Sequence, residues 1–224
     1  LFYIFIFTHN SLYIFSKICY NKLSILERKI CMNILVQNYY NLYQNPNFQF
    51  NEGINIIIGK NGSGKTTLIM EMQEELKHKD IPYYEYRNED YEGKTKQQFL
   101  EDGDMKKLVR SIYNSEGQEI KFNFSLQVDK LGQFIRDNIQ SNHTEVFVLM
   151  DGMDSGLSID GIDEILDLFN KLVIPDCKKH NMKCYVVITA NCYEFVRNNK
   201  CINVTTGEEV TFDSYENYRD YILR

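Results

Sequence analysis

Residues 59–66 read GKNGSGKT, a combination of glycines, a lysine and a threonine that could bind nucleotide phosphates. They match the pattern G-x-x-x-x-G-K-[ST] at every fixed position. Gly59, Gly62 and Gly64 allow the backbone to curl, so that successive N–H groups point at phosphate oxygens. Lys65 would reach the β- and γ-phosphates, and the Thr66 hydroxyl would coordinate Mg²⁺. We therefore predict a nucleoside-triphosphate and Mg²⁺ site here, to which the neighbouring residues Asn61, Ser63 and Thr67 also contribute.

A second candidate site follows the apolar run 146–150. Asp151 ends this run, where a carboxylate can hold Mg²⁺ through water beside Thr66. The alternative interpretation is an aspartate in an ordinary strand-end turn. The next residue, Gly152, cannot polarise water. Asp154 lies three residues beyond Asp151, and we expect that it could face the same site.

The elements that must position these residues are predicted from hydrophobic periodicity. Strands alternate with helices, which indicates an α/β fold with a mainly parallel sheet flanked by helices and an N-terminal antiparallel β portion. Residues 118–139 alternate in part like a strand, but the longer pattern favours a helix. Strands are predicted at 33–40, 48–50, 53–59, 81–86, 145–151 and 183–189, helices at 65–79, 105–113, 118–139, 158–180, 193–199 and 215–223, and a hairpin around Gly207.

Several segments of the sequence resemble the motifs of a known family and follow one another in the order of that family. IIIGKNGSGKTTLI (56–69) is similar to the ATP-binding-cassette (ABC) class of P-loop ATPases. NSEGQ (114–118) resembles the signature of that class, VFVLMD (146–151) its Walker B strand, and SGL (155–157) the loop after it. VVITAN (186–191) resembles the strand that leads to the switch residue. The resemblance covers about residues 32–212, and the segment between the first two pieces is too short for coiled-coil arms. It therefore points to compact, stand-alone AAA/ABC-like ATP-binding proteins of bacterial or phage type.

The resemblance implies an ABC-ATPase-like P-loop NTPase fold that binds ATP and Mg²⁺ and forms a head-to-tail homodimer around two ATPs. Ser115 and Gly117 would then touch the γ-phosphate held by the partner. The same residues also fit an ordinary helix start, with Ser115 as N-cap. The family's switch histidine would fall near Asn191, which cannot carry charge, and its usual glutamate falls at Gly152. Tyr40 or Tyr43 could stack on adenine, but in a chain with 16 tyrosines chance explains the match more readily. Gln97 or Gln98 could be the Q-loop residue, but an exposed polar helix explains them more readily.

These features give three ranked hypotheses for function. The first is a Mg²⁺-dependent ATPase in which Lys65, Asp151, Asp154 and Asn191 act in catalysis and ATP drives dimerisation as a switch. The second is a non-hydrolysing ATP-binding module, because Gly152 and Asn191 replace two usual catalytic groups. The third, a P-loop nucleotide kinase, ranks low because Arg87, Arg110 and Arg136 are scattered without the motif of a lid.

Composition limits the remaining classes. The 224 residues are 43% hydrophobic and 25% charged, which is typical of a globular domain, and the formal net charge of −6 argues against a broadly basic nucleic-acid binder. Six cysteines without a C-x-x-C pair favour reduced thiols in a cytoplasmic protein. Residues 1–31 are apolar but interrupted, so we expect no membrane insertion. We expect 1–31 to be upstream sequence and 32–224 to be one ATPase domain; the sequence identifies no DNA or protein partner.

Overall fold

The computed structural model describes residues 31–87, 116–153, 158–197 and 199–223, with side chains omitted for 116–127. The chain divides into two compact units, Leu1–Cys31 and Met32–Arg224. That residues 32–224 form one ATPase domain stays a prediction. All five cysteines in the described residues are free thiols.

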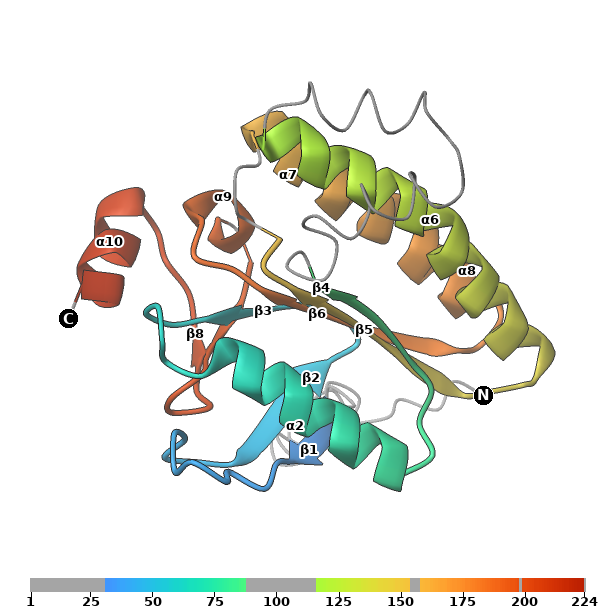
Figure 1. Ribbon diagram of the computed structural model, residues 1–224, viewed down its shortest axis with the longest axis horizontal. Helices are drawn as coiled ribbons and strands as arrows, with labels where there is room; N and C mark the ends of the chain where they lie inside the picture. Colours follow the sequence, from blue (N-terminus) through green and yellow to red (C-terminus); the bar gives the residue numbers. More distant parts are fainter. Residues whose placement is uncertain (1–30, 88–115, 154–157, 198, 224) are drawn as a thin grey trace, which may run out of the picture. The chain divides into compact units, whose positions relative to one another are not determined.

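The second unit has a six-stranded sheet with strand order β4-β5-β6-β3-β7-β8 (Figure 1). The pairs β4–β5, β5–β6, β6–β3 and β3–β7 are parallel, and β7–β8 is antiparallel. β1 and β2 form a separate two-stranded antiparallel sheet. The predicted α/β class with a mainly parallel sheet and an N-terminal antiparallel portion is therefore confirmed. The strands are β1 Cys31–Leu35, β2 Asn47–Asn51, β3 Gly53–Ile58, β4 Tyr83–Arg87, β5 Glu145–Asp151, β6 Lys183–Thr189, β7 Cys201–Asn203 and β8 Glu209–Val210.

Helices cover both faces of the main sheet (Figure 1). One face carries α2 and the small β1–β2 sheet, and the other carries α6, α7 and α8. The helical elements are α2 Lys65–His78, α6 Glu116–Gln140, α7 Ile159–Leu168, the π-helical turn η1 Phe169–Val173, α8 Ile174–Lys179, α9 Tyr193–Val196 and α10 Tyr215–Leu223. The helix predicted over 118–139 is confirmed as α6, and the one predicted over 158–180 contains the π-helical turn.

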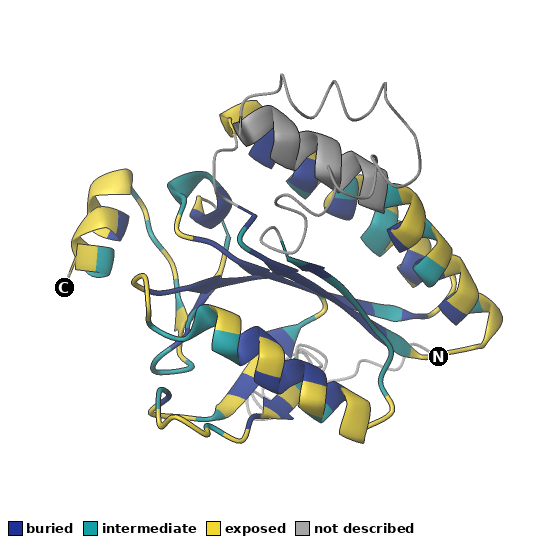
Figure 2. Ribbon diagram, in the orientation of Figure 1, coloured by how far each residue is buried: buried dark blue, intermediate teal, exposed yellow. Residues whose placement is uncertain are grey.

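The core forms two layers because alternate strand residues face opposite sides of the sheet. Val148 and Val186 pack under the helical layer of α6 and α7. Phe147 and Val187 pack with Leu68 and other apolar residues of α2. The central strands are therefore buried on both sides (Figure 2). This is why they read as continuous apolar runs in the sequence rather than alternating ones.

The strand predicted at 33–40 was wrong beyond residue 35. β1 ends at Leu35, and Asn38 adopts a left-handed backbone with φ 54°. The Asn38 side chain accepts the N–H of Tyr43 and donates to its carbonyl, which closes a compact loop. The carboxylate of Glu71 on α2 accepts the N–H groups of Asn38 at 2.7 Å and Tyr39 at 3.3 Å. A buried side chain on a later helix therefore overrides the local strand pattern.

Candidate functional site

The phosphate-binding motif forms a tight loop between β3 and α2. Ser63 N–H donates to the Lys60 carbonyl at 3.1 Å, and Gly64 has φ 95° directly before the first helical residue. This left-handed conformation is one that glycine adopts without the steric penalty of a Cβ. A Cβ on Gly59 would lie 2.5 Å from Ser63 Oγ and 2.6 Å from a Val204 methyl group. The motif's glycines are therefore required by the local geometry as well as by phosphate chemistry.

Lys65 is the first residue of α2, and its side chain folds back over the loop. Its ammonium donates to the carbonyls of Gly59 at 2.8 Å and Lys60 at 3.1 Å. These bonds hold a positive charge beside the N–H groups at the start of a helix, where anions are stabilised. Thr66 is exposed on the next residue and Thr67 is half-buried. The lysine and the Thr66 hydroxyl are therefore placed at the N-terminus of α2.

The loop has the character of a polar cradle for an anion. Ser63 Oγ is buried and has no hydrogen-bond partner among the residues that the structure describes. A buried hydroxyl without a partner is costly, and a phosphate oxygen is a suitable acceptor for it. Glycine is needed at position 59 for this arrangement, because a Cβ there would collide with the Ser63 hydroxyl at 2.5 Å. The residues present therefore fit a bound phosphate group.

Asp151 and Thr189 form a polar pair at the carboxyl ends of neighbouring strands. The Thr189 hydroxyl donates to Asp151 Oδ1 at 2.5 Å, and both side chains are buried. They lie two residues beyond Leu149 and Val187, whose side chains pack on the α2 side of the sheet. Asp151 therefore faces the same side of the sheet as the helix that begins with Lys65. Thr189 was not among the residues singled out from the sequence, and its only signal is a polar residue that ends the apolar run 184–188.

Gly152, at the position of the missing glutamate, has a structural role. Its φ is 70°, and its N–H donates to the Thr189 hydroxyl at 3.2 Å. The hydroxyl of Thr189 thus accepts from Gly152 and donates to Asp151 in one short network. Any side chain at position 152 would have to adopt a left-handed backbone to keep this network. The turn after β5 therefore favours glycine for conformational reasons.

Gly152→Ala is accordingly expected to lower the free energy of unfolding by about 1–2 kcal/mol, the penalty of a Cβ in the left-handed region. Gly132→Ala is the matched control, because Gly132 lies inside α6, where alanine is favoured by up to about 1 kcal/mol. A Cβ there would meet only the flexible end of Arg136, at 3.3 Å. Urea unfolding of both variants measures the difference. An equal change in both would contradict the left-handed turn at Gly152.

Asn191 lies beside the phosphate loop. Its side-chain amide donates to Asn61 Oδ1 of the loop at 2.7 Å. The connection between the two segments is direct, because β6 pairs in parallel with β3 and Ala190 N–H donates to the Ile57 carbonyl at 3.1 Å. The residue predicted at the switch position is therefore in contact with the motif, although its role in catalysis stays a prediction.

The two tyrosines considered for adenine stacking have different environments. Tyr43 is 5% exposed, packs edge-on against Phe48, and donates its hydroxyl to the Gly64 carbonyl at 3.0 Å. Burial raises the pKa of Tyr43, so its hydroxyl stays a protonated donor. This residue supports the phosphate loop through its bond to Gly64. Because its ring is buried, it is not placed to stack on a base. Tyr40 is 73% exposed.

Other predicted site residues lie outside the described residues. These are Ser115, Asp154, the loop 155–157, and the glutamines at 97 and 98. Gly117 lies in the first turn of α6. Within the described ranges, no group of three or more His, Cys, Asp or Glu side chains could hold a metal ion. Mg²⁺ in nucleotide sites does not need such a group, because it takes most ligands from phosphates and water.

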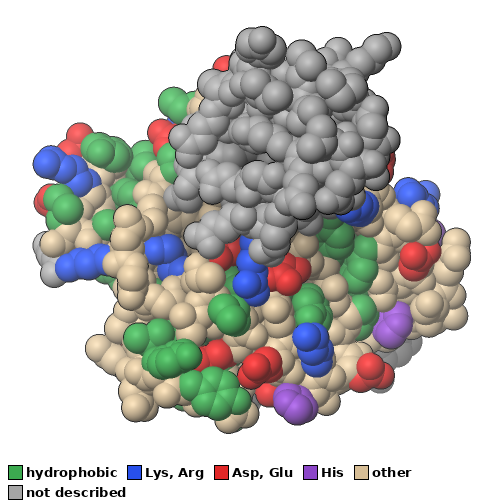
Figure 3. Space-filling view, viewed as in Figure 1, with side chains coloured by type: hydrophobic (Ala, Val, Ile, Leu, Met, Phe, Trp, Pro, Cys, Tyr) green, Lys and Arg blue, Asp and Glu red, His purple; other side chains and the backbone are tan. Residues whose placement is uncertain are grey.

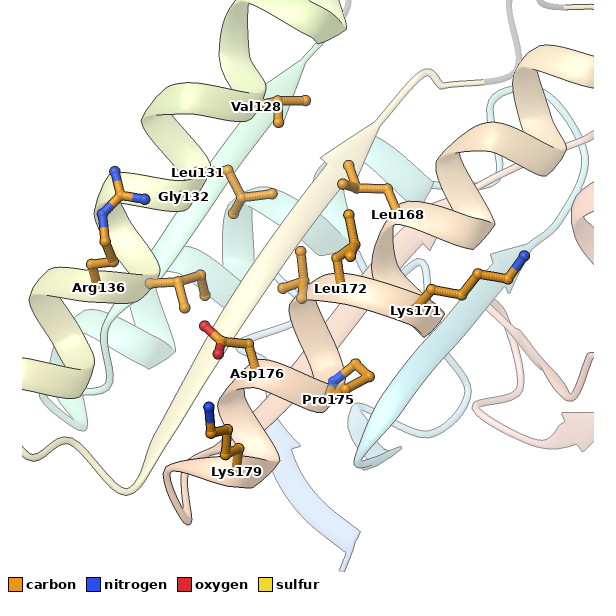
Figure 4. Close-up of a pocket in the computed structure, with 12 residues that line it drawn as sticks. Val128, Leu131, Gly132, Arg136, Leu168, Lys171, Leu172, Pro175, Asp176 and Lys179 are labelled. Atoms are coloured by element: carbon orange, nitrogen blue, oxygen red, sulfur yellow. The ribbon is translucent and has the colours of Figure 1, made fainter.

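A groove of about 570 Å³ lies between α6 and the η1–α8 segment (Figure 4). Its wall includes Leu131 and Ile135 from α6 and Leu172 from the π-helical turn, with Arg136 and Asp176 at its edge. None of its lining residues belongs to the phosphate loop or to the ends of β5 and β6. The groove is therefore separate from the residues that could bind phosphate.

The surface does not gather positive charge on the described part of the face seen in Figure 3. Basic and acidic side chains alternate there, with apolar side chains between them. A nucleic-acid interface would show a continuous basic stripe or patch. In the described ranges, no helix is long and apolar enough to span a membrane.

Comparison with known proteins adds one finding. Residues 34–73 match a family model described as an AAA domain. The matched segment runs from β1 through the phosphate loop into α2. It supports an AAA-type P-loop ATPase-like domain that binds nucleotide, a class whose members generally use ATP and Mg²⁺. No curated protein matches the chain.

Proposed function

We propose that this protein is an ABC-type ATPase that hydrolyses ATP slowly with Mg²⁺ and dimerises on ATP as a switch. The observation that carries the proposal is the Asp151–Thr189 pair, located on the two strands that precede β3 in the sheet order. Ligands of parallel α/β sheets bind outside the carboxyl ends of the strands. The phosphate loop, the buried carboxylate and Asn191 all lie at that end.

The residues divide the chemistry between them. The loop N–H groups and the Ser63 hydroxyl bind phosphate oxygens, and the Lys65 ammonium neutralises charge on the β- and γ-phosphates. Thr66 and Asp151 would hold Mg²⁺, which when bound offsets phosphate charge during transfer. Thr189 engages Oδ1 of Asp151, and the carboxylate keeps acceptor capacity at Oδ2. Asn191 can donate a neutral hydrogen bond in place of the charged one of a histidine.

Dimerisation follows from the proposed ABC-type arrangement. Ser115 and Gly117 would contact the γ-phosphate bound by the partner, with residues 155–157 at the dimer contact. The hydroxyl and the backbone N–H groups at the start of a helix provide suitable phosphate donors. The AAA-domain match supports nucleotide binding in general and leaves this arrangement as a proposal.

The alternative is an ATP-binding module without hydrolysis, which the glycine at position 152 favours. Two of the three arginines considered for a kinase lid already interact with neighbouring side chains, which weakens the kinase hypothesis. Arg87 is paired with Glu85 and donates to Gln73 at 3.4 Å, and Arg136 donates to Gln133 at 3.1 Å. Both guanidinium groups are thus held by side chains that lie next to them.

The test measures both ATP turnover and the molecular mass of the protein. The full chain is expected to release phosphate from ATP only with Mg²⁺, and to double its mass by light scattering when ATP is present. Binding and dimerisation without phosphate release would favour the alternative module. Failure to bind ATP by a folded chain would reject both.

Asp154→Asn decides which group orients the water. If Asp154 replaces the missing glutamate, this variant is expected to lose turnover on the order of 10²-fold while keeping ATP affinity, because general-base catalysis is worth about 10²–10⁴-fold. Asp160→Asn, in the first turn of α7, is a charge-matched control. Single-turnover phosphate release measures both. Equal rates would assign the water-orienting role to another residue.

A further inference from the structure

The C-terminal helix α10 is anchored to the end of β6 by one tyrosine. Tyr218 is 4% exposed, and its hydroxyl donates to the Asn191 carbonyl at 2.6 Å. Its ring packs against Tyr193 of α9, at 5.9 Å between centroids, and against Phe212, at 5.3 Å. The ring contacts fix the direction of the hydroxyl, so that the hydrogen bond restrains the backbone of Asn191.

The side chain of the same asparagine contacts the phosphate loop. Asn191 Nδ2 donates to Asn61 Oδ1 at 2.7 Å. On the residue before it, Ala190 N–H donates to the Ile57 carbonyl on the strand that leads into the loop. Two hydrogen bonds in series therefore connect α10 with Asn61, across segments distant in the sequence.

We propose that Tyr218 is a positioning residue of the nucleotide site and acts through Asn191 on Asn61. The proposal rests on the proposed function, because it requires that residues 59–66 bind phosphate. Asn61 and Asn191 are exposed, so their mutual orientation depends on what restrains the backbone on either side. A loop held in its binding geometry loses less conformational freedom when the ligand arrives. Removing the Tyr218 hydroxyl therefore weakens phosphate binding without touching the phosphate.

The same helix supplies a matched control. Tyr221, one turn after Tyr218, accepts a hydrogen bond from Asn203 Nδ2 at 2.5 Å, and its ring also packs on Phe212. Its hydroxyl accepts from Asn203, which pairs with Ile58 of β3, and not from the Asn191 segment that contacts Asn61. Tyr218→Phe and Tyr221→Phe each remove one hydroxyl from α10 and leave the ring contacts in place. A purely structural role for α10 predicts the same effect from both.

The experiment measures the Kd of the full chain by calorimetry for two probes, MgATP and inorganic triphosphate. Tyr218→Phe is expected to raise both Kd values about fivefold, the loss that corresponds to one net hydrogen bond. Tyr221→Phe is expected to leave both within about twofold of the unmodified chain, the scatter of a neutral change. The effect should be the same for both probes, because it acts on the loop and not on the base. Thermal unfolding of each variant reports α10 stability separately.

A double-mutant cycle tests the route of the effect. In the Asn191→Ala background, Tyr218→Phe should no longer change the Kd, because the side chain that transmits the restraint is gone. Equal Kd values for the two tyrosine variants, or an unchanged effect in the Asn191→Ala background, would overturn the inference alone. If the unmodified folded chain binds neither probe, the proposed function fails and the inference fails with it.

Discussion

Replacing Lys65 with alanine is expected to lower the rate of ATP hydrolysis on the order of 10³-fold, because a charge that stabilises the transferring phosphoryl group is removed. The ammonium already lies over the loop, bonded to the carbonyls of Gly59 and Lys60. Bound phosphates would compete for the same charge, so the variant loses phosphate affinity as well as rate. Phosphate release at saturating MgATP separates the loss in kcat from the loss in affinity.

Lys60→Ala is the matched control for this result. Lys60 is an exposed lysine of the same loop, and it contributes its backbone carbonyl rather than its ammonium to the contact with Lys65. We expect this variant to keep turnover within about twofold, as surface substitutions generally do. A background rate shared by the unmodified chain and Lys65→Ala would show that the observed phosphate release is not catalysed at this loop.

The conformation of residues 59–66 was predictable because it is set locally. Gly64 must take up a left-handed backbone before the first turn of α2, and Lys65 folds onto carbonyls five and six residues away. Such constraints involve residues that are close together in the sequence, so a sequence motif identifies them. The buried strands were predictable for a related reason, since strands covered on both faces leave unbroken apolar runs.

The partnership of Asp151 with Thr189 was not predictable from the sequence alone. It joins residues 38 positions apart, and depends on the register of β5 beside β6. The loop after β1 shows the same limit. Glu71 on α2 accepts two backbone N–H groups of residues 38 and 39, and this contact ends the strand early. Periodicity reports which residues face the core, but it carries no information about which polar groups meet at the ends of elements.

Asp151→Asn is expected to lower Mg²⁺-dependent turnover by at least about 10²-fold, because metal-bound charge stabilisation is worth several kcal/mol. Asparagine keeps an oxygen of the same shape that can still accept the Thr189 hydroxyl, so the fold should persist while the charge is lost. A Mg²⁺ titration of ATP turnover measures the effect. A variant that keeps the rate and Mg²⁺ dependence of the unmodified chain would remove Asp151 from the metal site.

Substitutions at Thr189 test the orientation of Asp151 without changing its charge. Thr189→Val keeps the shape of the side chain but removes the hydroxyl that engages both Asp151 and Gly152. Groups that orient a metal-binding residue are worth about 10–100-fold in activity or metal affinity. We therefore expect Thr189→Val to shift the Mg²⁺ titration to higher concentration by that factor, and Thr189→Ser, which keeps the hydroxyl, to restore it. If serine and valine give the same titration, the hydroxyl does not position Asp151, and the pair is a structural contact between β5 and β6.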